Sequence, residues 1–175
     1  PDKLDLRSES PSHRFREYHR VYQAPYQCHP VFGIVRTHDL AKTALIGSYV
    51  SSDRVLLGEL VLRGKIYEIQ EKLFYSRFHP DSSVRKYPEF RDLVVWFDPK
   101  KRGKLQMVRW IMLSEYLAAI RRTKLSKREK TTCYLLMGQW LIWNRRGLLK
   151  DTLKGLFWPV VRPAIVKKIK APGSS

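Results

Sequence analysis

Apolar residues recur at steps of three and four along much of this chain, which is the spacing of one face of an α-helix. They follow this pattern over residues 53–78, where Asp53 can cap the first turn, and again over residues 105–122. Gly64 interrupts the first segment and lowers its helix propensity. The pattern predicts a mainly α protein with a small helical core.

A capping box predicts where the next helix begins. Ser126 is followed three residues later by Glu129, so each side chain can accept a hydrogen bond from the other residue's backbone N–H. Gly147 is expected to end this helix, because glycine is common just after a helix C-terminus. A separate segment, residues 148–158, should then end at Pro159.

The first 30 residues lack a steady apolar period. Pro11, Pro25 and Pro30 interrupt them, and aromatic residues alternate irregularly with charged ones. Such a segment buries no core of its own, so we expect residues 1–30 to form an extended arm. The arm should make few contacts with its own domain and many with neighbouring proteins.

Residues 93–97 form an apolar run that is too short for periodicity to separate strand from helix. Asp98 and Pro99 end the run in either case. A short hairpin near residues 93–112 therefore stays open as an alternative to a helix.

Charge divides the chain more sharply than hydrophobicity does. The 175 residues carry a net charge of +18, yet residues 1–30 and 31–99 contribute only +1 each. Residues 100–175 hold nineteen basic and three acidic side chains, a net charge of +16. We therefore expect an arm, a near-neutral helical core at 31–99 and a strongly basic helical extension at 100–175, within one domain or joined to it. Charge segregated in this way indicates a polyanion-binding surface.

The basic residues gather in clusters, most of them where a helix is expected to start or stop. Exposed side chains and free backbone N–H groups can both reach phosphates at such places. Neighbouring Trp and Tyr side chains offer faces on which unpaired bases stack. The candidate RNA-binding residues are Lys100, Lys101, Arg102, Lys104 and Arg109, then Arg121, Arg122, Lys124, Lys127, Arg128 and Lys130, then Arg145, Arg146, Lys150 and Lys154, with Lys167, Lys168 and Lys170 near the end.

Most catalytic and cofactor chemistry finds no support in the sequence. No GxGxxG, GxxxxGK[ST] or HExxH motif occurs, and the five His and two Cys residues never adopt a paired metal-ligand spacing. Cys133 stands among apolar residues and is expected to be a small core side chain. We therefore expect no enzyme activity, no cofactor and no metal.

One nuclease pattern remains as a third hypothesis. Asp81 after Pro80, and Asp98 two residues before Lys100, match the PD…(D/E)xK arrangement, in which two carboxylates hold a divalent cation. Residues 93–97 would supply the strand that such a site needs. Pro99 would break that strand's edge, and the motif is short, so a loop and an Asp-Pro turn are the favoured interpretation.

No segment is long enough to predict a transmembrane helix. The most apolar stretch, residues 133–143, contains eleven residues, whereas a spanning helix needs about 20. Trp140, Trp143 and Trp158 beside basic residues suit an anionic lipid surface, an RNA surface or a protein core. The alternative function is therefore a peripheral accessory subunit of a respiratory or ATP-synthase complex, lying on anionic lipid.

A small helical core, basic helix junctions, an aromatic arm and a basic end together resemble the design of organellar ribosomal proteins. The resemblance implies a structural rRNA-binding component of a mitochondrial ribosome in the matrix, with any presequence removed. It also implies neighbouring ribosomal proteins along the N-terminal arm. The sequence contains no RNP motif, KH-type GXXG loop or zinc finger, so RNA would be bound by shape and backbone charge.

Overall fold

The computed structural model describes residues 4–23, 28–75, 86–87 and 90–170. Over these ranges the protein is mainly helical, as its sequence predicts, and the one β-type pairing is an isolated bridge between Leu6 and Ile66. The elements in chain order are α1 (Pro11–Val21), η1 (His29–Phe32), α2 (Thr37–Leu40), α3 (Ser52–Arg63), α5 (Phe90–Phe97), η2 (Pro99–Lys101), α6 (Val108–Arg122) and α7 (Lys127–Lys170).

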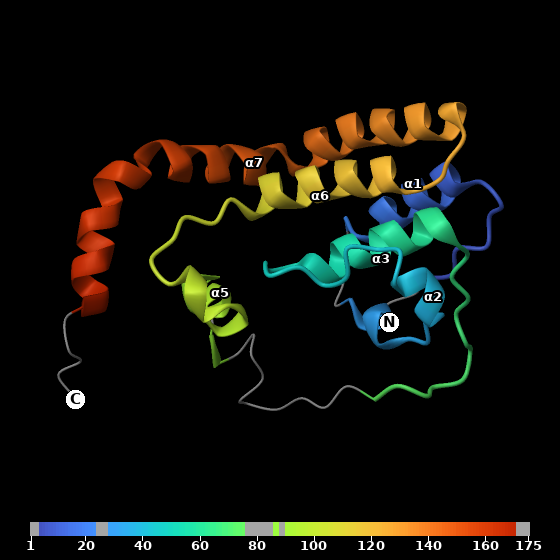
Figure 1. Cartoon of the computed structure of the whole chain (residues 1–175), viewed down its shortest axis with the longest axis horizontal. Helices are drawn as coiled ribbons and strands as arrows, with labels where there is room; N and C mark the ends of the chain where they lie inside the picture. The colour runs from blue at the N-terminus through green and yellow to red at the C-terminus, as the bar shows by residue number, and fades with distance from the viewer. Residues whose placement is uncertain (1–3, 24–27, 76–85, 88–89, 171–175) are drawn as a thin grey trace.

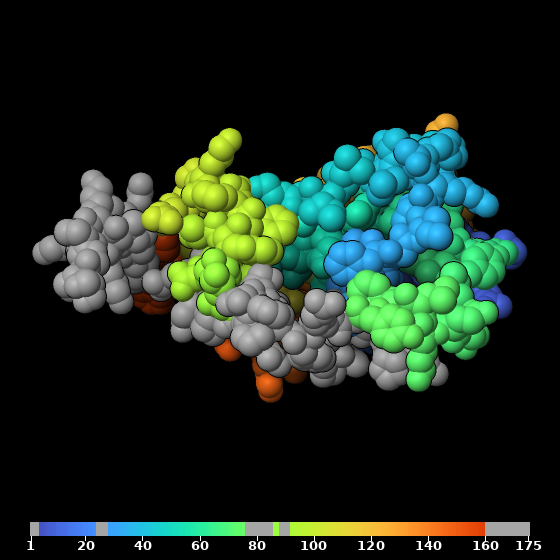
Figure 2. Space-filling view, turned by 90° about the horizontal axis from the view of Figure 1, so that it is seen from below, coloured from blue at the N-terminus to red at the C-terminus, as the bar shows by residue number. Residues whose placement is uncertain are grey.

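An antiparallel pair, α6 and α7, forms one side of the molecule, and α1 and α3 pack beneath it (Figure 1). The opposite face carries α5 and η2, residues 30–50 and the segment 65–75, while α7 is visible only at its margins (Figure 2). Tyr116 of α6 and Cys133 and Trp140 of α7 meet in the core between these layers. The prediction that Cys133 is a core side chain is confirmed.

The helix that begins near Ser126 is much longer than predicted. α7 passes through Gly147 without ending, because Leu148 and Asp151 continue its buried face along α6. A side chain at Gly147 would meet Arg109, since an added Cβ would lie 3.1 Å from its Nε, so glycine serves close helix packing there. Pro159 does not end the helix either. α7 bends in its red, C-terminal part, as a proline inside a helix predicts (Figure 1).

The N-terminal segment is not an extended arm in its described part, so that prediction is wrong. Ser10 accepts a hydrogen bond from His13 N–H, and Pro11 occupies the first turn of α1. Proline is favoured at that position because its fixed φ suits a helix start and its missing N–H has no intrahelical partner there. Phe15 and Tyr18 are fully buried against α3 and the rest of the core. The segment therefore completes its own domain.

The Glu129 side chain holds the start of α1 against the start of α7. Ser126 Oγ accepts the Glu129 N–H at 3.2 Å, which is one half of the predicted capping box. The carboxylate of Glu129 turns away from its own helix and accepts from Ser12 N–H at 2.7 Å and from Ser10 Oγ at 2.8 Å. One side chain thus joins the start of α7 to the start of α1.

α3 is shorter than the helix predicted over 53–78, and Ser51 rather than Asp53 occupies its N-cap position. It ends at Arg63, and Ile66 then exchanges backbone hydrogen bonds with Leu6 at 2.8 and 3.0 Å. The buried guanidinium of Arg14 donates to the carbonyl oxygens of Val61 and Leu62, at 2.8 and 3.3 Å. A cation at the negative end of a helix stabilises that end.

The run at residues 93–97 belongs to helix α5, so the alternative of a hairpin near 93–112 is wrong. Val94 is buried while Trp96 and Phe97 stay substantially exposed, which is the one-sided burial of a short surface helix. Asp98 ends the run as predicted and caps η2 by accepting Lys100 N–H at 3.0 Å.

A buried carboxylate joins α3 to α6. Glu59 is 1% exposed, and its oxygens accept from Arg63 and Arg122, each at 2.7 Å. Burial acts to raise the pKa of Glu59, but the hydrogen bonds from Arg122 and Arg63 outweigh it and hold the pKa below its usual 4.5. The stabilisation is therefore complete above pH 4.5 and is lost as the pH falls through the lowered pKa.

Glu59→Gln should lower the free energy of unfolding by roughly 3 kcal/mol, because it leaves two guanidinium groups beside a neutral amide. Glu71→Gln, at an exposed position, should change it by less than about 0.5 kcal/mol. Urea unfolding at pH 7 measures both variants. Equal stabilities would show that the Glu59 pairing does not hold α3 against α6.

His19 introduces a second pH dependence. Its ring is buried edge-on to Phe15 and Tyr116, with centroids 4.4 and 4.8 Å apart, and burial lowers its pKa to about 3. The unfolded chain binds a proton near pH 6.5 while the folded protein does not, so stability falls as the pH drops below 6.5.

Between pH 7.5 and 5.5 the wild type should therefore lose about 1.4 kcal/mol of stability through His19. His19→Phe should remove most of this loss, whereas His13→Phe, on the exposed side of α1, should retain it. Urea titrations at the two pH values test this expectation. The same loss in His19→Phe as in the wild type would contradict it.

Candidate nucleic-acid interface

The basic clusters separate into two groups at opposite ends of the α6–α7 pair. The first surrounds the connection between the helices, and we call it the turn group: Arg121, Lys124, Lys127, Arg128 and Lys130. The first four of these side chains are exposed, and Lys130 donates to the carbonyl oxygen of Arg121 at 3.3 Å. The group lies where α6 ends and α7 begins, as the sequence predicts.

The second group forms because the helices run antiparallel. Arg109 Nη1 donates to Asn144 Oδ1 at 3.0 Å, and Trp110 Nε1 donates to Thr152 Oγ1 at 3.0 Å. The start of α6 therefore lies beside the middle of α7, and two clusters that are distant in sequence meet. We call four exposed residues here the base group: Lys104, Arg145, Arg146 and Lys150. The 15 residues of α6 separate the two groups by about 22 Å.

Three predicted RNA-binding residues have structural roles instead of lying free on the surface. Arg122 binds Glu59, Arg109 binds Asn144, and Lys101 Nζ donates to the carbonyl oxygen of Ser48. Lys100 and Arg102 remain exposed near η2. The side chains of Lys167, Lys168 and Lys170 lie outside the described ones.

The three carboxylates of residues 100–175 do not neutralise these groups. Glu129 caps α1, and Asp151 is buried, where it accepts the Arg109 N–H at 2.8 Å. Glu115 acts on Arg122, whose guanidinium pKa is raised mainly by the hydrogen bond to Glu59 and also by the charge of Glu115. Within the described part of the chain, these three carboxylates therefore form no ion pair with the turn group or with Lys104, Arg145, Arg146 and Lys150.

Three tryptophans of the basic half differ in environment. Trp140 is buried in the core, so of the three environments that the sequence allowed (core, RNA surface or lipid surface) it occupies the core. Trp143 and Trp158 are partly exposed. They remain available to a partner.

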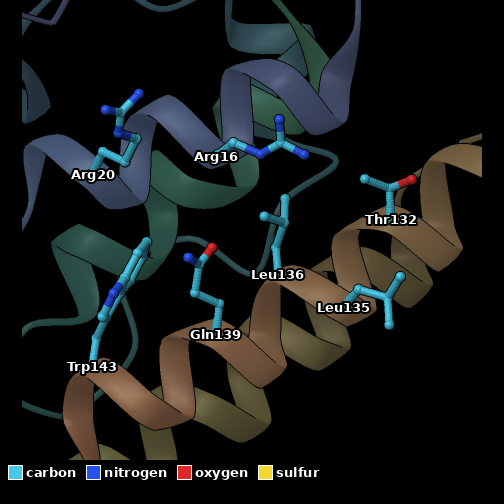
Figure 3. Close-up of a pocket in the computed structure, with 7 residues that line it drawn as sticks. All are labelled: Arg16, Arg20, Thr132, Leu135, Leu136, Gln139 and Trp143. Atoms are coloured by element: carbon cyan, nitrogen blue, oxygen red, sulfur yellow. The ribbon is translucent and has the colours of Figure 1, made fainter.

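Sequence reasoning missed the contribution of α1 to this side of the molecule. Arg16 and Arg20 were assigned to an arm, but α1 places them across from α7, where they line a groove of about 570 Å³ (Figure 3). The other lining residues come from one side of α7: Thr132, Leu135, Leu136, Gln139 and Trp143. The signal that could have revealed the groove was Ser10-Pro11, a helix start followed by two arginines one turn apart.

α7 also exposes an apolar stripe on the side opposite its buried face. Leu135, Ile142, Leu149 and Leu156 follow one another at intervals of seven residues, and each is at least 60% exposed. From Leu135 to Leu156, a span of 21 residue steps, α7 extends about 32 Å. The core does not require these side chains, because Cys133, Trp140 and Leu148 cover the inner face.

The nuclease hypothesis gains no geometry from the structure. Asp81 lies outside the described residues, and the strand expected before Asp98 is helix α5. The hydrogen bond from the Ser48 hydroxyl lowers the pKa of the Asp98 carboxyl, and the Lys100 N–H contributes to the shift. No cluster of three metal-ligating side chains occurs in the part of the chain that the structure describes.

Comparisons with protein-family models, curated proteins and solved structures find no match to this chain. Among the described helices, none has the length and apolarity that crossing a bilayer requires.

Proposed function

We propose that this protein is a structural rRNA-binding component of a mitochondrial ribosome and that it binds RNA through the phosphate backbone. The observation that carries the proposal is the exposure of cations at both ends of the α6–α7 pair, while Glu129 binds the start of α1 and Asp151 is buried against α6. Clustered, exposed cations favour binding to an external polyanion.

The rigid α6–α7 pair sets the spacing between the two groups. A separation of about 22 Å allows the turn group and the base group to contact phosphates on different segments of one folded RNA. Arginines such as Arg128 and Arg146 add forked hydrogen bonds that lysines do not make. The interface recognises RNA by shape and charge, and this function requires no catalysed reaction.

The basic helix junctions and the small helical core support the proposed place in a ribosome. Since α1 belongs to the core, the neighbouring proteins expected along residues 1–30 need another surface. The stripe of exposed leucine and isoleucine residues on α7 is the described surface best suited to that role, because apolar surface of this kind is typical of interaction sites.

A salt series tests the RNA-binding proposal. Arg145→Gln, Arg146→Gln and Lys150→Gln, combined, should reduce the slope of log affinity against log salt by roughly 2–3, because each lost phosphate contact removes about 0.7–0.9. Arg122 must be left unchanged, since it holds Glu59. The probe is a structured RNA stem-loop, and binding is measured by fluorescence anisotropy.

The matched control replaces three exposed cations of the near-neutral region, Arg36, Lys72 and Lys86, by Gln. This variant loses the same charge. It should change the slope by less than about 0.9, the contribution of one phosphate contact. Equal slopes in the two triple variants would show that net charge alone, and not the base group, attracts RNA. The proposed interface would then be wrong.

The apolar stripe on α7 favours one second candidate, an anionic lipid surface, as in a peripheral subunit of a respiratory or ATP-synthase complex. An interfacial helix needs an apolar side and flanking cations, which α7 offers in Leu149 and Leu156 beside Arg146 and Lys150. The cations would lie near lipid phosphates while the leucines enter the acyl boundary.

The combined change Leu149→Gln and Leu156→Gln separates this candidate from RNA binding. If lipid is the partner, affinity for phosphatidylcholine vesicles containing phosphatidylglycerol should fall at least tenfold, because burying each leucine contributes roughly 1.5–3 kcal/mol. Leu45→Gln with Leu73→Gln, at exposed positions elsewhere, should leave vesicle affinity unchanged. No vesicle binding by the wild type would exclude the lipid candidate.

A further inference from the structure

We infer that the groove between α1 and α7 binds one unpaired nucleotide, with its phosphate at the arginines of α1 and its base against Trp143. The inference rests on the proposed RNA-binding function and deepens it, because phosphate contacts alone select charge and shape. A pocket for a single base would let the protein distinguish a looped or bulged nucleotide from a paired one.

The groove exists because α1 and α7 are tied together at one end. Glu129 holds Ser10 and Ser12 beside the first turn of α7. Further along, Leu136, Gln139 and Trp143 project from α7 towards α1, which carries Arg16 and Arg20 (Figure 3). The volume of about 570 Å³ falls within the range of small-ligand sites, roughly 300–1,000 Å³.

The lining residues supply the contacts that a nucleotide needs. Arg16 and Arg20 lie one helical turn apart on α1, and their guanidinium groups point in different directions (Figure 3). Both are exposed and mobile enough to offer a phosphate forked hydrogen bonds at the edge of the groove. Trp143 is partly exposed and offers an aromatic face for stacking. Gln139 has both a donor and an acceptor for the edge of a base, and Leu136 provides an apolar floor.

The charge balance of the groove favours an anion. Among the described residues, the lining contains two arginines and no carboxylate. Arg20 contacts Glu17 at 3.1 Å, but both side chains are solvent-accessible, and an ion pair of this kind contributes little. A phosphate can therefore replace Glu17 as the partner of Arg20 at small energetic cost.

The groove is also continuous with the rest of the proposed interface. Thr132 follows Lys127 and Arg128 of the turn group by one helical turn, and Trp143 precedes Arg146 of the base group. An RNA strand that bridges the two groups along α7 therefore passes the groove. This placement favours a nucleotide of bound RNA over a free mononucleotide.

The test compares two RNA probes with the full chain. One is a single-stranded hexauridylate and the other is a blunt duplex of matched charge. Trp143→Leu should weaken binding of the single strand roughly tenfold or more, the effect of losing one base–aromatic stack, and leave duplex binding within twofold. Trp96→Leu, which removes an exposed tryptophan from α5, is the matched control and should alter neither affinity.

Arg16→Gln with Arg20→Gln gives a second measure that preserves the apolar floor. This double variant should weaken binding of the single strand more than binding of the duplex. In a separate measurement, the single strand should quench tryptophan fluorescence in the wild type, and this quenching should disappear in Trp143→Leu. Equal loss for both probes, or no loss for either, would overturn the inference. Since duplex binding through the base group is measured separately, that result would leave the RNA-binding proposal intact.

A titration with adenosine monophosphate identifies the source of the nucleotide. Weak or undetectable binding beside tight single-strand binding supports a nucleotide presented by RNA. Tighter binding of the mononucleotide than of the hexauridylate would instead make the groove a free-nucleotide site and overturn its assignment to RNA.

Discussion

The buried carboxylate of Glu59 is the interaction on which the arrangement of the helices depends. Arg63 of the same helix and Arg122 at the end of α6 both bind it, so α6 is fixed against α3 at its C-terminal end. A charge buried to this degree is tolerated only when it is paired. Because α7 begins a few residues after Arg122, this pairing also fixes where the longest helix starts across the core.

Three carboxylates of the chain join helices and do not lie free on the surface. Glu59 binds Arg63 and Arg122, Glu129 joins α7 to α1, and Asp151 joins α7 to α6, whereas most of the turn group and all of the base group are exposed. The net charge of residues 100–175 is therefore more exposed than a count of residues suggests. The proposed interface for a polyanion consists of these exposed cations.

α1 connects core packing with the proposed recognition of RNA. Phe15 and Tyr18 complete the core, and the guanidinium of Arg14 holds the end of α3. The outward side of the same helix carries Arg16 and Arg20 to the groove beside α7. The stability of the domain and the geometry of the groove thus depend on one short helix and on the Glu129 carboxylate that caps it.

The sequence by itself determined the helical class, the helix ending at Arg122, the helix start after Ser126 and the segregation of charge, because these follow from local periodicity, capping and composition. Tertiary structure decided the rest. Whether Gly147 ends a helix depends on a continuing partner surface, and the partner of Glu129 lies more than one hundred residues away. Local propensity is too weak to fix such outcomes, since burial against distant residues outweighs it.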